Sequence, residues 1–128
     1  MDYEGIIIEE SLGNTAVLRR LTILSTRIES VTDWHATPWL AHWTFHTVIV
    51  PEQDADEIAA LIGRAIDRQH ATSWYADYKN DTHHYVIYSD CAFYIDRRSA
   101  EEYEEARAYG IERGLPEYQA DFVHIVTP

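Results

Sequence analysis

Cysteine is nearly absent from the sequence: Cys91 is the only one among 128 residues. A disulfide bond within the chain and a zinc site built from several cysteines are therefore excluded. The first residues lack the basic start and long apolar stretch of an export signal, and no segment has the roughly 20 apolar residues that span a bilayer. We expect a cytoplasmic protein with no membrane partner.

Basic residues are also scarce. Ten Lys and Arg residues stand against 22 Asp and Glu residues, which gives a formal net charge of −12 at pH 7. Nucleic acids and anionic membranes are bound by clustered basic side chains that displace counterions, so this charge argues against nucleic acid as a partner. A protein-interaction or inhibitor module with an acidic surface stays open as one alternative function.

Glycine and proline are few, with five and four residues, whereas nine tyrosines and four tryptophans make the chain rich in aromatic side chains. This composition is typical of a folded globule and not of a disordered tail. A chain of 128 residues has the length of one domain with a real core. We predict a single domain over residues 1–128.

The hydrophobic patterns predict a mixture of strands and helices. Apolar stripes at helical spacing, with capping residues before them, predict two helices, at residues 52–69 and 99–116. Strands are predicted at residues 4–10, 16–31 and 42–50, as three short strands within 73–96, and as a final strand or extended tail at 121–128.

This order of elements predicts an α+β fold. We expect a mainly antiparallel sheet with two helices, in the split βαβ plan of a ferredoxin-like sandwich, with an N-terminal β-hairpin extension formed by the first two strands. Helices in that plan cover one face of the sheet, and an exposed apolar second face would associate. We therefore expect a homodimer, although the hairpin, a loop or a ligand could also cover that face.

The segment HWTFHTVIV places His42 and His46 four residues apart. On a helix they would share one face, as a metal pair needs. The segment is rich in Thr, Val, Ile and aromatic residues and is followed by Pro51, which indicates a strand. Along a strand the two residues lie about 13 Å apart, so they cannot bind one ion together. We predict neither a metal site nor a cofactor.

Four segments, GIIIEES, WYADYKND, HYVIY and PEYQ, together resemble a family of short prokaryotic hypothetical proteins whose activity is not assigned. The resemblance covers nearly the whole chain. It implies a compact single-domain protein and transfers no catalytic residues.

The segment WYADYKND is the strongest candidate for a binding site. Alternation along a strand places Tyr75, Asp77 and Lys79 on one face. An aromatic ring, an acceptor and a cation together suit a small polar or nucleotide-like anionic metabolite, although the same spacing also suits a solvated ion pair beside packing tyrosines. The predicted ligand-binding residues are Tyr75, Asp77, Lys79 and Asn80, with Trp39, His46 and Arg97 as further walls.

Three His-x-Thr triplets begin at His35, His42 and His70. Two such triplets on neighbouring strands would suit a histidine-dependent phosphodiesterase of the two-histidine type, with one imidazole as base and the other as acid. The candidate catalytic residues for this alternative are His42, Thr44 and His70. Histidines scattered among strands equally suit packing or surface roles. The sequence leaves open whether any reaction is catalysed.

Overall fold

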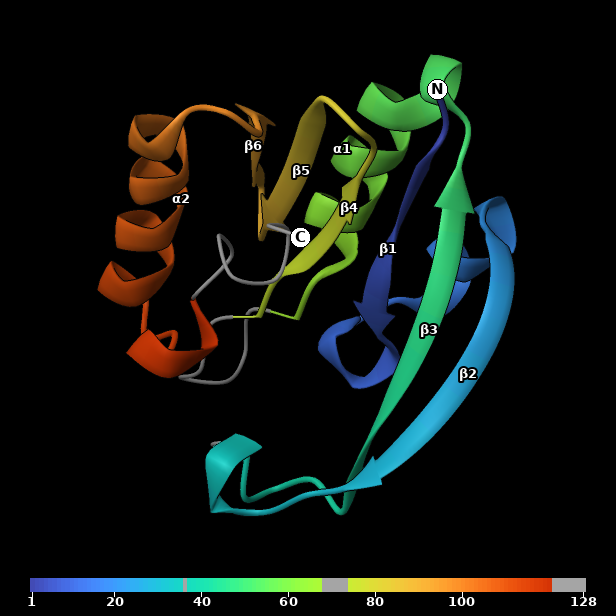
Figure 1. Cartoon of the computed structure of the whole chain (residues 1–128). Coiled ribbons are helices and arrows are strands. Elements are labelled where there is room, and N and C mark those ends of the chain that lie inside the picture. The colour runs from blue at the N-terminus through green and yellow to red at the C-terminus, as the bar shows by residue number, and fades with distance from the viewer. Residues whose placement is uncertain (36, 68–73, 121–128) are drawn as a thin grey trace.

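The computed structural model describes residues 1–35, 37–67 and 74–120. Its centre is one six-stranded sheet with the strand order β2-β3-β1-β4-β5-β6, in which every neighbouring pair is antiparallel (Figure 1). The strands are β1 (Tyr3–Ile8), β2 (Thr22–Ser30), β3 (His42–Val50), β4 (Ala76–Lys79), β5 (His83–Tyr88) and β6 (Cys91–Asp96). The α+β class and the antiparallel sheet are confirmed.

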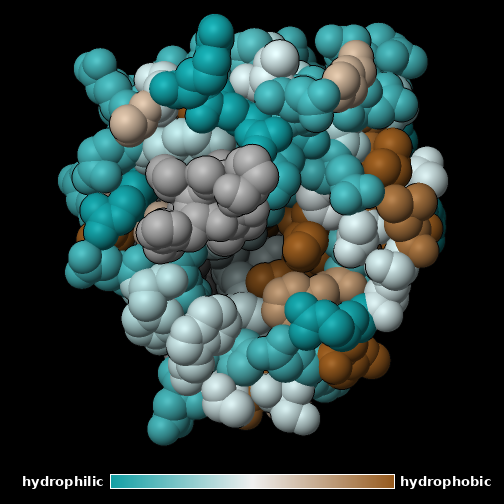
Figure 2. All heavy atoms as spheres, in the orientation of Figure 1, coloured by the Kyte–Doolittle hydropathy of each residue, from teal (hydrophilic) through white to brown (hydrophobic). Residues whose placement is uncertain are grey.

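Two α-helices, α1 (Ala55–Ala65) and α2 (Ala100–Glu112), and several short 3-10 helices accompany the sheet. No helix within the described ranges has the length and apolar character needed to cross a membrane. The surface seen from the side of Figure 1 is mostly hydrophilic, with hydrophobic side chains gathered at its centre and along the rim that carries β2 and β3 (Figure 2).

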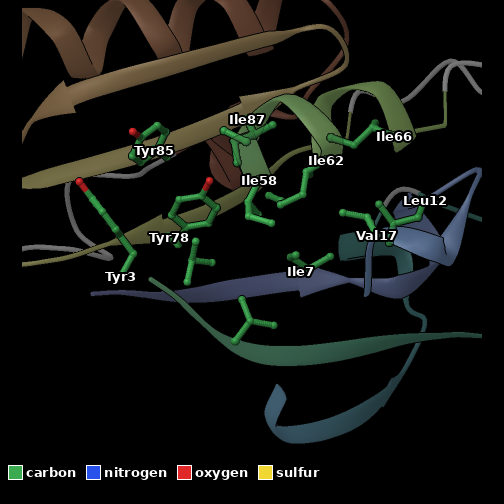
Figure 3. Close-up of a cluster of buried hydrophobic side chains, with 14 of the residues drawn as sticks. Tyr3, Ile7, Leu12, Val17, Ile58, Ile62, Ile66, Tyr78, Tyr85 and Ile87 are labelled. Atoms are coloured by element: carbon green, nitrogen blue, oxygen red, sulfur yellow. The ribbon is translucent and has the colours of Figure 1, made fainter. Parts of the chain in front are cut away.

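Helix α1 forms because its apolar residues recur at helical spacing and give it one continuous apolar stripe. Ile58 and Ile62 on this stripe are fully buried against the sheet. Side chains of four strands, β1, β3, β4 and β5, meet them in one cluster. Figure 3 shows this cluster between the helix and the sheet; its labelled members are Tyr3, Ile7, Leu12, Val17, Ile58, Ile62, Ile66, Tyr78, Tyr85 and Ile87.

Helix α2 begins where the sequence predicts. The Ser99 side chain accepts a hydrogen bond of 3.1 Å from the backbone N–H of Glu102, which satisfies one of the free donors of the first turn. Tyr103 and Ala106 are buried in a second cluster, together with Val86 and Ile95 of the sheet.

The two helices lie on opposite faces of the sheet (Figure 1). Alternation along the strands explains this arrangement, because neighbouring residues of β5 point to opposite sides. Tyr85 and Ile87 belong to the α1 cluster, and Val86 and Tyr88 belong to the α2 cluster. We name the two sides the α1 face and the α2 face.

The ferredoxin-like split plan is not confirmed. That plan needs both helices on one face, whereas here they flank the sheet, and β1 lies between β3 and β4. Gly5 permits this central place for β1, because a side chain there would collide with the backbone of Asp77 and Tyr78 on β4. β1 pairs with β3 along its whole length and with β4 from Glu4 to Ile6, so it is a central strand of the sheet.

The N-terminal hairpin is not confirmed either, because β1 and β2 are not neighbours in the sheet. A strand was predicted over residues 16–31, but Thr15–Arg20 form a 3-10 helix with Val17 buried, and β2 begins only at Thr22. The backbone N–H of Gly13 donates to the carbonyl oxygen of Ala65 at 2.7 Å, which ties this connection to the end of α1. The chain therefore crosses beside α1 before it returns to the outer side of β3.

The other predicted elements are present, with different ends. Both helices are shorter than predicted, since α1 ends at Ala65 and α2 at Glu112, and β1 ends at Ile8, where the 3-10 helix Glu9–Ser11 follows. Residues 42–50 form a strand, and residues 76–96 form the predicted meander of three strands with turns at Asn80 and Asp90. The strand β2 carries a bulge at Leu24, where its register to β3 shifts. The predicted final segment, 121–128, lies outside the described residues.

Candidate functional site

The predicted recognition strand is β4, and its polar residues point to the α2 face. Asp77 pairs in register with Val86, and Lys79 pairs with His84, and both partners lie on the α2 face. The ring of Tyr75 lies on the same side, 6.2 Å from the ring of Tyr88. The structure thus brings Tyr75, Asp77 and Lys79 to one face, as alternation predicts.

Asp77 belongs to a buried chain of polar groups that the sequence did not reveal. Its carboxylate oxygen Oδ2 lies 2.7 Å from Nε2 of His84, and Nδ1 of His84 lies 3.1 Å from the hydroxyl of Tyr103 on α2. His84 is 0% exposed. Burial raises the pKa of Tyr103, although Arg97 nearby acts to lower it. Asp77 therefore holds a histidine in the core beneath α2.

Asn80 and Arg97 meet at the turn between β4 and β5. The side-chain oxygen of Asn80 accepts hydrogen bonds from the backbone N–H groups of Thr82 and His83, at 3.0 and 2.9 Å. The Arg97 guanidinium donates to the backbone carbonyl of Asn80. These polar groups build the turn, as Asn does in many turns.

His46 and Trp39 do not join the other predicted ligand residues. His46 pairs in register with Ile7, whose side chain is buried on the α1 face. Its ring nitrogens lie 2.9 Å from Thr26 and 2.9 Å from Glu9. Trp39 lies in the loop between β2 and β3 and is partly exposed. The seven predicted residues therefore do not line one pocket.

The candidates for a two-histidine site are only partly described. Glu10 accepts hydrogen bonds from the backbone N–H of Thr44 at 2.6 Å and from its hydroxyl at 2.7 Å. The same carboxylate lies 3.5 Å from Nε2 of the exposed His42. His42, Thr44 and Glu10 thus form one cluster, whereas His70 lies outside the described residues.

A groove of about 470 Å³ lies between α1 and the strands β5 and β6. Its size is within the range of sites for small molecules. The lining residues are Asp56, Ala59, Ala60, Gly63, Arg64, Tyr85, Asp90, Cys91, Ala92 and Tyr94.

Two cross-strand tyrosines form the aromatic side of this groove. Tyr94 is 53% exposed, and its ring is parallel to that of His83, with ring centroids 4.4 Å apart and an interplanar angle of 4°. The ring of Tyr85 lies 4.9 Å from that of Tyr94, and its hydroxyl donates to Asp56 on α1. Burial, followed by this hydrogen bond, raises the pKa of Tyr85, so its hydroxyl stays protonated at neutral pH.

The wall contributed by α1 is charged. Arg64 is exposed at the groove and makes no ion pair or hydrogen bond within the described residues. Asp56 lies on the same side of the helix and is held by Tyr85. The sequence does not predict this groove, because no local spacing connects a helix arginine with a tyrosine on a later strand. The one local signal in the sequence is an aromatic residue, Tyr94, within the predicted short strand that ends at residue 96.

Among the described residues, no group of three His, Cys, Asp or Glu side chains is arranged to hold a metal ion. Comparison with protein-family models, with curated proteins and with solved structures finds no match. The geometry of the groove and of the polar clusters is therefore the basis for assigning a function.

Proposed function

We propose that the protein binds a small polar ligand that carries an aromatic ring and an anionic group, as a nucleotide does, in the groove between α1 and β5–β6. The observation that supports this proposal is the combination in one groove of two groups. One is the exposed ring of Tyr94, which stacks on His83 with one of its faces. The other is the Arg64 guanidinium, which has no ion-pair partner in the part of the chain that the structure describes. No catalytic step is part of the proposal.

Each lining group has a distinct role in this binding mode. Tyr94 offers a flat face to an aromatic ring, and such contacts contribute beyond the area that they bury. The Arg64 guanidinium suits phosphate or carboxylate, which it can bind through two parallel hydrogen bonds. Asp56, already fixed by Tyr85, can accept a hydrogen bond from an amino or hydroxyl group of the ligand.

The net charge of −12 on the protein limits how many negative charges the ligand can carry. A long polyanion would be repelled by the rest of the surface, whereas one anionic group of a small molecule needs only one local cation. The groove therefore favours a mononucleotide or a similar metabolite over a nucleic acid strand.

A thermal-shift screen with nucleoside monophosphates, cyclic nucleotides and sugar phosphates tests the proposal, because a ligand that binds the folded state raises its melting temperature. Calorimetric titration of the best compound should then show affinity falling roughly tenfold in Arg64→Ala and in Tyr94→Ala. Arg107→Ala is the matched control, because it also removes one positive charge but lies on α2, where it pairs with Glu104 and Glu117.

Two results would contradict this proposal. One is the absence of any thermal shift across the three classes of compound. The other is a loss of affinity in Arg107→Ala equal to that in Arg64→Ala, because a general charge effect would then account for the binding.

A second candidate function is a histidine-dependent phosphodiesterase that uses His42. The observation in its favour is that the Glu10 carboxylate accepts a hydrogen bond from the Thr44 hydroxyl and lies 3.5 Å from Nε2 of His42. A hydroxyl and an exposed imidazole therefore lie beside the same carboxylate. Slow hydrolysis of a cyclic phosphate that is lost in His42→Ala and kept in His83→Ala would support it. Equal rates in wild type and His42→Ala would exclude it.

A further inference from the structure

The strand β2 is an edge of the sheet, and it is exposed along almost its whole length. Within the described residues its backbone pairs with β3 on one side only, and there its other side presents free N–H and C=O groups. Ile28 is 67% exposed, which is the highest value among the large hydrophobic side chains in the described part of the chain. In Figure 1, β2 forms the outer rim of the sheet, with no other element beyond it.

The outer half of β2 is regular. From Ser25 to Ser30 each residue has one partner on β3, and the bulge lies before this stretch, at Leu24. A regular free edge can pair with another strand, whereas a bulge disturbs the spacing of its backbone groups. The segment that is free to pair is therefore centred near Ile28.

The charges that flank Ile28 are held in place. The Arg27 guanidinium lies 2.7 Å from a carboxylate oxygen of Glu29, and it also lies over the ring of Phe45, 4.4 Å from the ring centroid. The second carboxylate oxygen of Glu29 lies 2.9 Å from Nε2 of the buried His35. Because both side chains are already ordered, a partner that contacts them loses less conformational entropy on binding.

We propose that two copies of this chain form a homodimer by antiparallel pairing of their β2 strands, with a twofold axis at Ile28. This register places Ile28 against Ile28 of the second copy. It also places Arg27 opposite Glu29 of the second copy, and Glu29 opposite the second copy's Arg27. The edge is thus complementary to itself in charge and in apolar contact, as a twofold interface requires.

The bulge excludes the neighbouring register. A twofold axis at Thr26 would place Leu24 opposite Ile28 of the second copy, so the bulged residue would fall inside the paired segment. An axis at Ile28 places Leu24 beyond the end of β2 in the second copy, because β2 ends at Ser30. The Ile28 register therefore pairs regular backbone with regular backbone.

Charge reversal in separate chains tests the dimer. Arg27→Glu and Glu29→Arg, each measured alone by sedimentation velocity, should raise the dissociation constant of the dimer at least tenfold, because like charges then face each other. An equimolar mixture of the two variants should recover dimers at the wild-type concentration, because unlike charges again face each other. A fault within one folded chain cannot be repaired by mixing.

Cysteine substitution tests the register, in a Cys91→Ser background. Ile28→Cys should form a disulfide-linked dimer under mild oxidation, because residues on the axis have Cα atoms within the range that a disulfide spans. Thr26→Cys is the matched control on the same strand and should stay largely unlinked. Cross-linking at position 26 and not at position 28 would overturn the register.

Ile28→Lys keeps the proposal testable if Glu29→Arg does not fold. It should leave the protein folded and monomeric at concentrations at which the wild type is a dimer. A wild type that sediments as a monomer at all accessible concentrations, or an Ile28→Lys variant that stays dimeric, would overturn the proposal.

Discussion

Two histidines of this protein occupy similar chains of hydrogen bonds in different surroundings. His84 joins Asp77 to the hydroxyl of Tyr103, and His46 joins Glu9 to the hydroxyl of Thr26. The first chain lies beneath α2 on the α2 face, and the second lies on the α1 face near the open edge of the sheet. Both consist of a carboxylate, an imidazole and a hydroxyl.

The difference between the two chains is access to water. His84 has no exposed surface, and Tyr103 is also buried, so neither can replace a lost partner with solvent. Around His46, Thr26 is exposed and the Glu9 side chain is 44% exposed, so both can turn to water. A buried polar group that loses its hydrogen-bond partner destabilises the folded state, whereas an exposed group can form a new hydrogen bond with water. The same set of groups should therefore matter for stability in one place and little in the other.

The largest effect is expected for His84→Ala. It leaves the Asp77 carboxylate without its partner and the Tyr103 hydroxyl without an acceptor in the core. We expect the free energy of unfolding to fall by roughly 3 kcal/mol or more, measured by urea denaturation.

The matched control for this prediction is Val86→Ala. Val86 is also 0% exposed and packs on the same face, but its truncation leaves no polar group without a hydrogen-bond partner. It should be less destabilising than His84→Ala. Equal losses in the two variants would mean that cavity formation, and not the broken polar chain, explains the effect.

The second effect concerns alkaline pH and Tyr103→Phe. The variant removes one donor to His84, so we expect a loss of roughly 1.5 kcal/mol at pH 8. Burial raises the pKa of Tyr103 in the folded state, and an unfolded tyrosine ionises near pH 10. The folded state therefore holds its proton where the unfolded state releases it, and this contribution to stability is lost as pH rises above about 10.

The wild type should thus lose stability from about pH 10 upward. Burial also raises the pKa of Tyr3, to about 12, so Tyr103 is not the only contributor. The fall in unfolding free energy between pH 8 and pH 10.5 should be smaller in Tyr103→Phe than in the wild type. Parallel profiles for the two proteins would show that the hydroxyl of Tyr103 ionises freely in the folded state.

Local sequence patterns correctly predicted the helices and strands that form because of interactions between neighbouring residues. The stripe of α1, the Ser99 cap of α2 and the β-branched residues of 42–50 each lie within a few neighbouring residues. The order of the strands depends on contacts between distant segments. Gly5, which lets β4 approach β1, is the one residue discussed above whose identity reflects the order of the strands.

The candidate sites follow the same rule. Alternation correctly placed Asp77 and Lys79 on one face of β4, because it acts along a single strand. The partner of Asp77 depends on the pairing of β4 with β5, which decides that His84 and not His83 turns toward α2. The groove joins Arg64 of α1 to Tyr94 of β6, and only the crossing of helix and sheet brings them together.

The smallest effect is expected for His46→Ala. In the monomer, at protein concentrations below the dissociation constant of the proposed dimer, the variant leaves Glu9 and Thr26 beside solvent. Water then replaces the ring as their partner, and the loss should be about 1 kcal/mol or less by urea denaturation. The hydrogen bonds around His46 involve no tyrosine. The unfolding free energy of the variant should therefore change with pH between pH 8 and pH 10.5 in parallel with that of the wild type. A loss in the monomer as large as that of His84→Ala would contradict this prediction. Above the dissociation constant the loss should be larger, since a second copy on the β2 edge would take water away from Thr26. Measuring the loss below and above this dissociation constant checks both expectations, because only a covered edge makes the loss depend on protein concentration.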